Sequence, residues 1–216
     1  MATTKVIDVL NRANKILNDV TKVRWQMQEL LDWFNDAQKA VVAQRPDANA
    51  VNTVFLCTNN SRQTLPSDGL RLIKVIRNTL AGTAITLIDE QILNEQARDW
   101  HNNSVTVTDV KHYIYDDRDP KHFYLFGVPV NTHSIDIVYS TAPVAIIIVN
   151  FLTDLQTITL DDVYVNPLID FILSRAYSKD AEYAADPARS SEHFNKFMAA
   201  LGNKTEADVA ASPNHG

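Results

Sequence analysis

Residues 113–126 of this chain read Tyr-Ile-Tyr-Asp-Asp-Arg-Asp-Pro-Lys-His-Phe-Tyr-Leu-Phe. Two apolar runs rich in aromatic side chains flank a charged turn that contains Pro120. Apolar runs on both sides of such a turn predict a β-hairpin. The stretch is a packing element, because its residues form no recognisable catalytic arrangement.

Short β-type runs continue on both sides of this hairpin, separated by Asn, Ser, Pro and Gly residues. The predicted strands cover residues 54–56, 71–76, 84–87, 105–107 and 134–139. Apolar and polar residues alternate over 134–139, as in a half-buried strand. A short helix is expected over 89–99, with Trp100 at its end.

Farther out, towards both ends of the chain, apolar residues recur at helical spacing. Residues 6–20 and 23–41 predict two amphipathic helices that pair as an antiparallel hairpin, and Pro46 ends the second. Near the C-terminus, Asn166 and Pro167 are suited to begin a helix that reaches Lys179. A last helix is expected from Pro187 to Gly202.

This order of elements predicts an α+β fold. It consists of a four-helix framework, with two N-terminal and two C-terminal helices, a β-rich insertion and a flexible C-terminal tail. The predicted divisions are an N-terminal helical hairpin (1–50), a β-rich region with a short helix near 89–100 (51–160), C-terminal helices that pack on the first two (161–202), and the flexible tail (203–216).

Composition excludes several classes of protein. Of 216 residues, 45% are apolar and 21% are charged, which is typical of globular proteins. A net charge of -6 disfavours binding to DNA phosphates, although DNA can slide past an acidic wall. The longest apolar run, Val144–Val149, is far shorter than the roughly 20 residues of a membrane helix. The N-terminus does not resemble a signal peptide, so we expect synthesis in the cytoplasm.

The sequence predicts no catalytic, metal or cofactor site. Asp116, Asp117 and Asp119 suggest a metal loop, but the loop lacks the glycine and glutamate of an EF-hand, which favours a solvated turn. If His112 and His122 face each other across the hairpin, they give at most a weak metal site with two ligands. We therefore expect no cofactor.

Several residues are candidates for contacts with other chains. Aromatic residues near polar loops are common at interfaces, which makes Trp100 a candidate for a subunit contact. The Ile-rich run 145–150 is interpreted either as an intersubunit strand or as an inner strand. The candidate interface residues are Trp100, Arg118, Ile146, Ile148, Lys204, Pro213 and Asn214.

Four segments carry a resemblance to a known family. They are Trp-Phe-Asn-Asp-Ala-Gln (33–38), Asp-Asp-Arg-Asp-Pro-Lys-His-Phe-Tyr (116–124), Val-Tyr-Ser-Thr-Ala-Pro (138–143) and Leu-Ser-Arg-Ala-Tyr-Ser-Lys-Asp-Ala-Glu-Tyr (173–183). In this order, over residues 4–202, the chain resembles the head-to-tail adaptor, or connector, proteins of short-tailed bacteriophages, the tail tubular protein A-like family.

The resemblance implies a structural virion protein without enzymatic activity. Such a protein forms a homo-oligomeric, dodecameric ring that joins the portal protein to the tail tube or nozzle protein and lines the DNA exit channel. DNA would pass without sequence-specific binding, and no membrane is involved. The resemblance places the protein in the neck or tail of the virion after synthesis in the host cytoplasm, with the helices and C-terminal extension on the portal.

Two alternatives stay open at this point. One is another ring-forming tail or head-completion protein, such as a stopper, placed one layer lower in the virion. The other is a virion-associated cell-wall hydrolase. The absence of an acidic or metal constellation on a recognisable lytic scaffold argues against the hydrolase.

Overall fold

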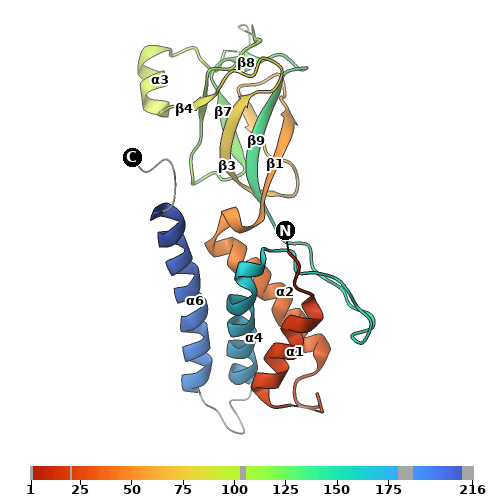
Figure 1. Ribbon diagram of the computed structural model, residues 1–216. Coiled ribbons are helices and arrows are strands. Elements are labelled where there is room, and N and C mark those ends of the chain that lie inside the picture. The colour runs from red at the N-terminus through yellow and green to blue at the C-terminus, as the bar shows by residue number, and fades with distance from the viewer. Residues whose placement is uncertain (1, 20, 103–105, 180–186, 211–216) are drawn as a thin grey trace. The chain divides into compact units, whose positions relative to one another are not determined.

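The computed structural model describes residues 2–19, 21–102, 106–179 and 187–210 (Figure 1). The chain forms two compact units. The helical unit comprises Met1–Ala48 and Pro143–Gly216, and the β unit comprises Asn49–Ala142. The protein is therefore an α+β protein in which a β-rich segment is inserted into a helical framework, as predicted.

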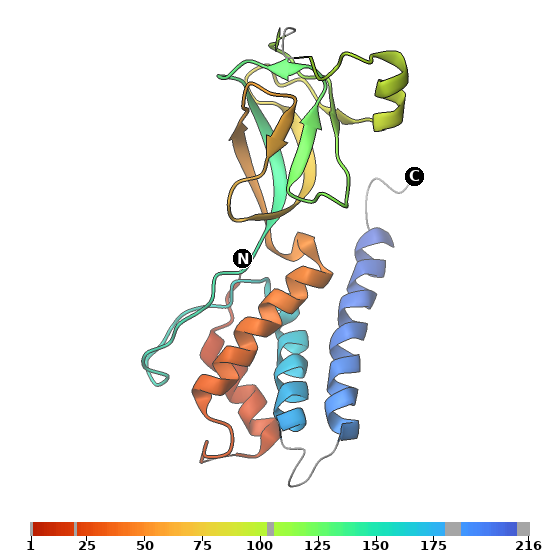
Figure 2. The same ribbon diagram turned by 180° about the vertical axis from the view of Figure 1, so that it is seen from behind.

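The helical unit contains two helices from each end of the chain. They are α1 (Val6–Leu17), α2 (Met27–Gln44), α4 (Val165–Lys179) and α6 (Pro187–Ala210). A 3-10 helix, η2 (Asp162–Tyr164), precedes α4, and another, η1 (Pro46–Asn49), follows α2. Helix α4 packs against α1, α2 and α6, and lies between α6 and the N-terminal pair in both views (Figures 1 and 2).

The core of this unit follows from the helical spacing of its apolar residues. Each helix turns one apolar face inward, where side chains such as Leu10, Phe34 and Leu168 are fully buried. Between α4 and α6, the ring centroids of Phe171 and Phe197 are 5.2 Å apart. Each such side chain contributes about 1.5–3 kcal/mol by burial, so packing, more than helix propensity, holds these helices.

The helix starts differ from those expected from the apolar pattern, because side-chain hydrogen bonds hold the residues before each helix in turns. Helix α2 begins at Met27, because the carboxylate of Asp19 accepts hydrogen bonds from the backbone N–H groups of Arg24 and Trp25, both at 2.9 Å. Helix α4 begins at Val165, after a turn in which Asp161 accepts from the N–H of Val163. Both acceptors hold their segments in turns.

The last helix is longer than the sequence pattern indicated. We expected it to end at Gly202, but α6 continues to Ala210, so residues 203–210, predicted as part of a flexible tail, are helical. Glycine lowers helix propensity by only about 1 kcal/mol and does not by itself stop a helix. Lysine, glutamate and alanine after Gly202 favour its continuation.

The β unit contains three sheets in its described part. The strands are β1 (Ala50–Leu56), β2 (Arg62–Thr64), β3 (Gly69–Asn78), β4 (Thr86–Leu87), β5 (Thr106–Val107), β6 (His112–Ile114), β7 (His122–Leu125), β8 (Val128–Pro129) and β9 (Ser134–Thr141). Their orders are β1-β9-β3, β2-β7-β6-β4 and β5-β8. The predicted aromatic hairpin is present as β6 and β7, and the predicted short helix is α3 (Glu90–Gln96), which Asp89 caps.

The core of the β unit lies on one face of β9. Ile135, Ile137 and Tyr139 alternate along this strand and are buried, together with Phe123 and Leu125 of the hairpin. This burial of every second residue agrees with the alternation of apolar and polar residues in the sequence of 134–139.

Residues 143–160 differ from the predicted division of the chain. We assigned them to the β-rich region, but they belong to the helical unit, where Ile146, Ile148, Ile158 and Leu160 are buried in the helical core. Because they carry their apolar side chains to α2 and α4, they extend this core.

Candidate functional site

The segment from Pro143 to Leu160, which we call the projecting loop, extends sideways from the helices (Figures 1 and 2). Its first leg is bound by one side chain of α2. The amide nitrogen of Asn35 donates to the carbonyl of Ile146 at 3.0 Å, and the N–H of Ile146 donates back to Asn35 Oδ1 at 2.9 Å. The carboxamide thus makes the two hydrogen bonds that the backbone of a neighbouring strand would otherwise make. Ile146 and Ile148 are buried beside it.

The second leg is bound by the N-terminal segment and by α2. The N–H of Val6 donates to the carbonyl of Gln156, and the N–H of Ile158 donates to that of Thr4, at 2.9 and 3.0 Å. The N–H of Thr159 donates to Oε1 of Gln38, a fully buried side chain, at 3.0 Å. Both legs are therefore attached to the helices.

Asp162, just after the loop, holds the N-terminal segment that pairs with the second leg. Its carboxylate accepts hydrogen bonds from the hydroxyl of Thr3 at 2.6 Å and from the N–H groups of Thr3 and Thr4 at 2.9–3.1 Å. These hydrogen bonds lower the pKa of Asp162 well below its ordinary value, and the bond from the Thr3 hydroxyl has the largest effect. The carboxylate is ionised at neutral pH and anchors the base of the loop.

Apolar side chains cover the outward surface of the projecting loop. Five of them are 69–95% exposed: Val144, Ile147, Val149, Leu152 and Leu155. Asp154 is the only charged residue between Pro143 and Leu160. Neighbouring exposed apolar residues on an anchored segment are typical of a protein–protein contact. We therefore take the projecting loop as the leading candidate interaction surface.

A smaller apolar ridge lies on α6. Phe194 and Met198, one helical turn apart, are 45% and 37% exposed. The adjoining face of the helix is held against α4: the hydroxyl of Ser190 donates to the carbonyl of Ser174 at 2.8 Å, and His193 lies 2.8 Å from a carboxylate oxygen of Asp170. The position of the ridge on the unit is thus fixed by packing and hydrogen bonds.

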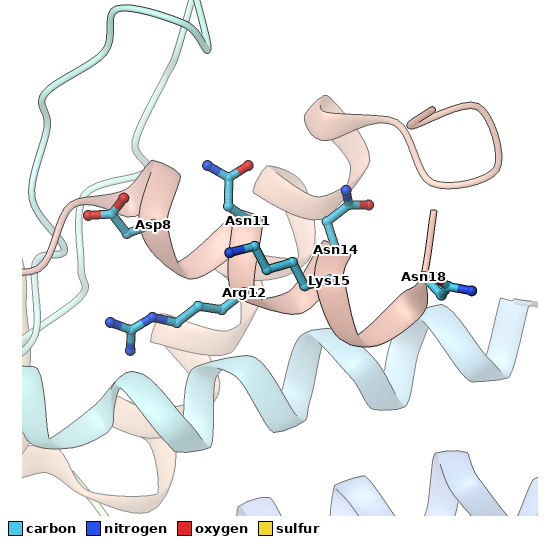
Figure 3. A pocket seen from close by; sticks show the side chains of 6 residues that line it. All are labelled: Asp8, Asn11, Arg12, Asn14, Lys15 and Asn18. Atoms are coloured by element: carbon cyan, nitrogen blue, oxygen red, sulfur yellow. The ribbon is translucent and has the colours of Figure 1, made fainter. Parts of the chain in front are cut away.

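A polar groove runs along α1 (Figure 3). The side chains that line it are Asp8, Asn11, Arg12, Asn14, Lys15 and Asn18. Asn14 is buried, and its Oδ1 atom has no hydrogen-bond partner in the described part of the chain. These lining residues include no serine, threonine, cysteine or histidine, and amide and basic groups suit recognition of a polar surface.

Trp100 does not lie where we expected. It is 5% exposed and packs with Leu93 and Ile114 inside the β unit. Its indole N–H donates to Asn94 Oδ1 at 3.0 Å, and its ring meets the edge of Tyr124 at a centroid distance of 6.0 Å. The indole thus closes a small cluster within its own chain, because α3 provides both an apolar and a polar partner, and it is not available for a subunit contact.

The hairpin turn uses its aspartates within the chain. The N–H of Arg118 donates to Asp116 at 2.9 Å, and the side chain of Arg118 is exposed. Asp117 pairs with Arg71 at 2.5 Å, which raises the pKa of the Arg71 guanidinium. Asp119 lies 2.6 Å from His122. The three carboxylates of the turn therefore have partners within the chain.

The two hairpin histidines have separate partners. His112 Nδ1 lies 2.7 Å from the hydroxyl of Thr86, whereas His122 binds Asp119. Over the residues that the structure describes, no group of three histidine, cysteine or acidic side chains could hold a metal ion. The single cysteine, Cys57, is buried, and burial raises the pKa of its thiol to about 12.

The remaining predicted interface residues are placed as follows. Ile146 and Ile148 belong to the helical core, in a segment that forms no β-strand, and the outward positions of the same run are Val144, Ile147 and Val149. Lys204 lies on the C-terminal part of α6. Pro213 and Asn214 lie outside the described residues. The sequence identified this Ile-rich run but not which of its side chains are exposed.

The comparisons with known proteins connect this architecture to one family. The model of the family described as SU10 adaptor protein matches residues 4–216, which include both units. A comparison with curated proteins returned no match. In the described ranges, no helix combines the length and the apolar character that crossing a membrane requires.

Proposed function

Because this chain belongs to the SU10 adaptor protein family, a family of structural phage proteins, we propose that it forms the ring that joins the portal to the tail. In this proposal the ring is dodecameric, lies in the neck of the virion, and has the portal protein on one side and the tail tube or nozzle protein on the other. The family match over nearly the whole chain carries the proposal.

The surfaces of the helical unit support assembly into a ring. A ring subunit needs a rigid body with two different surfaces, because each copy contacts the next through a heterologous interface that closes by rotation. The projecting loop and the α6 ridge are two such surfaces. Both are apolar at their centres, which is typical of the buried core of a protein–protein interface.

The charge of the chain supports a channel role. A net charge of -6 gives the ring wall an acidic character, so the wall would repel phosphates. Binding of DNA grows with the number of phosphates that lysine and arginine neutralise. A ring of these chains would therefore let DNA slide through without holding it and without reading its sequence.

The experiment that tests this function is native mass spectrometry of the purified chain, alone and mixed with its cognate portal ring. The expected result is a stoichiometric ring of this chain on the portal. A chain that ignores the portal but binds the nozzle protein would identify a stopper one layer lower. A chain that binds neither would overturn the proposal.

A further inference from the structure

The buried side chain of Asn78, the last residue of β3, joins several segments of the β unit. Its Nδ2 group donates to the carbonyl of Val110 and to the hydroxyl of Thr83, both at 2.8 Å. Its Oδ1 atom accepts from the N–H of Val110 at 3.0 Å. The ring of His133 completes the set, because its Nε2 atom lies 2.7 Å from the same Oδ1. One carboxamide thus links the end of β3 to the loop after β5 and to the turn after β8.

This network fixes which ring nitrogen of His133 carries hydrogen. Asn78 accepts from the N–H of Val110 and donates to the carbonyl of Val110, so the oxygen and nitrogen of its carboxamide cannot be exchanged. The Nε2 atom of His133 therefore faces an acceptor and carries a hydrogen, which it donates. The other ring nitrogen, Nδ1, is then the atom that gains a proton when the ring becomes charged.

The surroundings of His133 favour the neutral ring. Burial lowers the pKa of His133, and the carboxylate of Asp109 acts in the opposite direction. Asp136, on the adjoining strand β9, already pairs with Arg77 at 2.7 Å. Cys57, whose N–H donates to the carbonyl of His133, has a thiol pKa raised to about 12 by burial, so this thiol is neutral. Asp109 is therefore the charged group that opposes the effect of burial.

The contact between Asn78 and His133 holds a weak part of the β unit. Strands β5 and β8 pair in parallel over only two positions, and a pair of this length is not stable alone. The chain that leaves β5 reaches Val110, and the chain that leaves β8 reaches His133, so Asn78 binds both ends of the pair. Loss of the contact with His133 would leave the β8 end of the pair with less support.

We propose that the contact of His133 with Asn78 is a pH-sensitive latch on the β5–β8 pair, closed in neutral solution and opening in mildly acidic solution. The proposal concerns the β unit alone and goes beyond the adaptor function. Histidine suits such a role, because it is the side chain whose ordinary charge change falls between pH 5 and 8.

Linkage gives the direction of the effect. In the closed latch the pKa of His133 lies below its ordinary value of 6.5, whereas in an opened segment the ring meets water and regains that value. Above pH 6.5 both forms are neutral, and the latch has its full strength. Between 6.5 and the closed-state pKa, only the open form binds the proton, so a falling pH favours opening. Below the closed-state value both forms bind it, and the effect levels off.

Amide hydrogen exchange of the full chain, followed by mass spectrometry from pH 5 to 8, tests the latch. Rates are corrected for the intrinsic pH dependence of exchange, so that they report local opening. We expect the protection of peptides covering 106–111 and 128–133 to fall below pH 6.5, by at most about tenfold per pH unit because one proton is involved. Peptides from 135–139 in the central strand β9 serve as the internal reference and should keep their protection.

Two variants separate a titrating latch from a merely structural contact. In His133→Gln the side-chain amide can still donate to Asn78 but takes up no proton, so protection should no longer depend on pH. Asp109→Asn removes the charge that opposes burial, so its protection should continue to fall to a lower pH than in wild type. The matched control is His122→Gln, because His122 pairs with Asp119 in the hairpin turn, and it should follow the wild-type profile.

The outcomes divide clearly. A wild-type profile without pH dependence in 106–111 and 128–133 would overturn the latch, and so would a pH dependence that His133→Gln retains or that His122→Gln abolishes. Circular dichroism shows whether His133→Gln is folded. If it is not, Asp109→Asn decides: a loss of protection that extends to lower pH supports the latch, and a profile identical to that of wild type overturns it.

Discussion

The side chain of Asn35 and the backbone of Ile146, 111 residues apart, exchange two hydrogen bonds at 3.0 and 2.9 Å. One carboxamide of the N-terminal hairpin thereby pairs with both the N–H and the carbonyl of Ile146, in the segment that returns from the β unit. The contact fixes the direction of the projecting loop, and therefore the position of its exposed apolar residues. An asparagine of helix α2 thus helps to position the surface that we take as the leading candidate interaction surface.

Replacing Asn35 with alanine should destabilise the helical unit. The change leaves the N–H and carbonyl of buried Ile146 without partners, which typically costs about 1–3 kcal/mol. Urea unfolding measured by circular dichroism gives this difference. The control is Asn195→Ala on the exposed side of α6, which should change the free energy of unfolding by about half a kcal/mol or less. Equal stability of Asn35→Ala and wild type would contradict the anchoring role.

Asp162 should make the stability of the helical unit depend on acid pH. Hydrogen bonds from Thr3 and Thr4 lower its folded-state pKa below the ordinary value of 3.8. A lowered pKa contributes stability that is present above the unfolded-state pKa and is lost as the pH falls through the folded-state value. We expect wild type to lose stability below about pH 4, and Asp162→Asn to be less stable at pH 7 and to lose less on acidification.

Unfolding free energies between pH 2 and 7 check this prediction for Asp162→Asn. The matched control is Asp36→Asn, because Asp36 is exposed and pairs only loosely with Lys39, at 3.6 Å. Its profile should follow that of wild type. Parallel acid profiles for Asp162→Asn and wild type would show that the contacts with Thr3 and Thr4 do not hold the N-terminal segment.

Phe123 and its neighbour Tyr124 should respond differently to truncation. Phe123 is fully buried, and its ring lies 5.7 Å from that of Phe55, so Phe123→Ala should cost about 3–5 kcal/mol through lost burial and the cavity it leaves. Tyr124 is only partly buried, so Tyr124→Ala should cost less. Thermal unfolding of both variants measures the difference, and a cost for Phe123→Ala well under 1 kcal/mol would place this ring outside the core.

Deletion of residues 203–216 should separate folding from attachment to the portal. The buried contacts of α6, Phe197 and Leu201, precede the deletion, so the shortened chain should remain folded. Because we propose that the C-terminal extension engages the portal, we expect weaker association with the portal ring by native mass spectrometry. Deletion of residues 211–216 alone shows whether the last turns of α6 contribute. Unchanged attachment of the longer deletion would refute this role for the extension.

Local sequence patterns were sufficient for the element types. Helical periodicity marked both helical pairs, and the aromatic run around Pro120 marked the β6–β7 hairpin, because these signals arise from neighbours three to four or two positions apart. Helix boundaries were less predictable. Asp19 and Asp161 set the starts of α2 and of the turn before α4 through side-chain hydrogen bonds that depend on local backbone geometry.

The sequence by itself determined the α+β class, the helical framework with its β-rich insertion, and the Ile-rich run 145–150. Only the tertiary structure decided that Ile146 and Ile148 face the core while Ile147 and Val149 face outward, and that Trp100 is buried against α3. A run of apolar residues does not say which of its side chains are buried, because burial depends on partners such as Asn35, far away in the chain. The exposed surface of the projecting loop therefore depends on contacts that no local pattern contains.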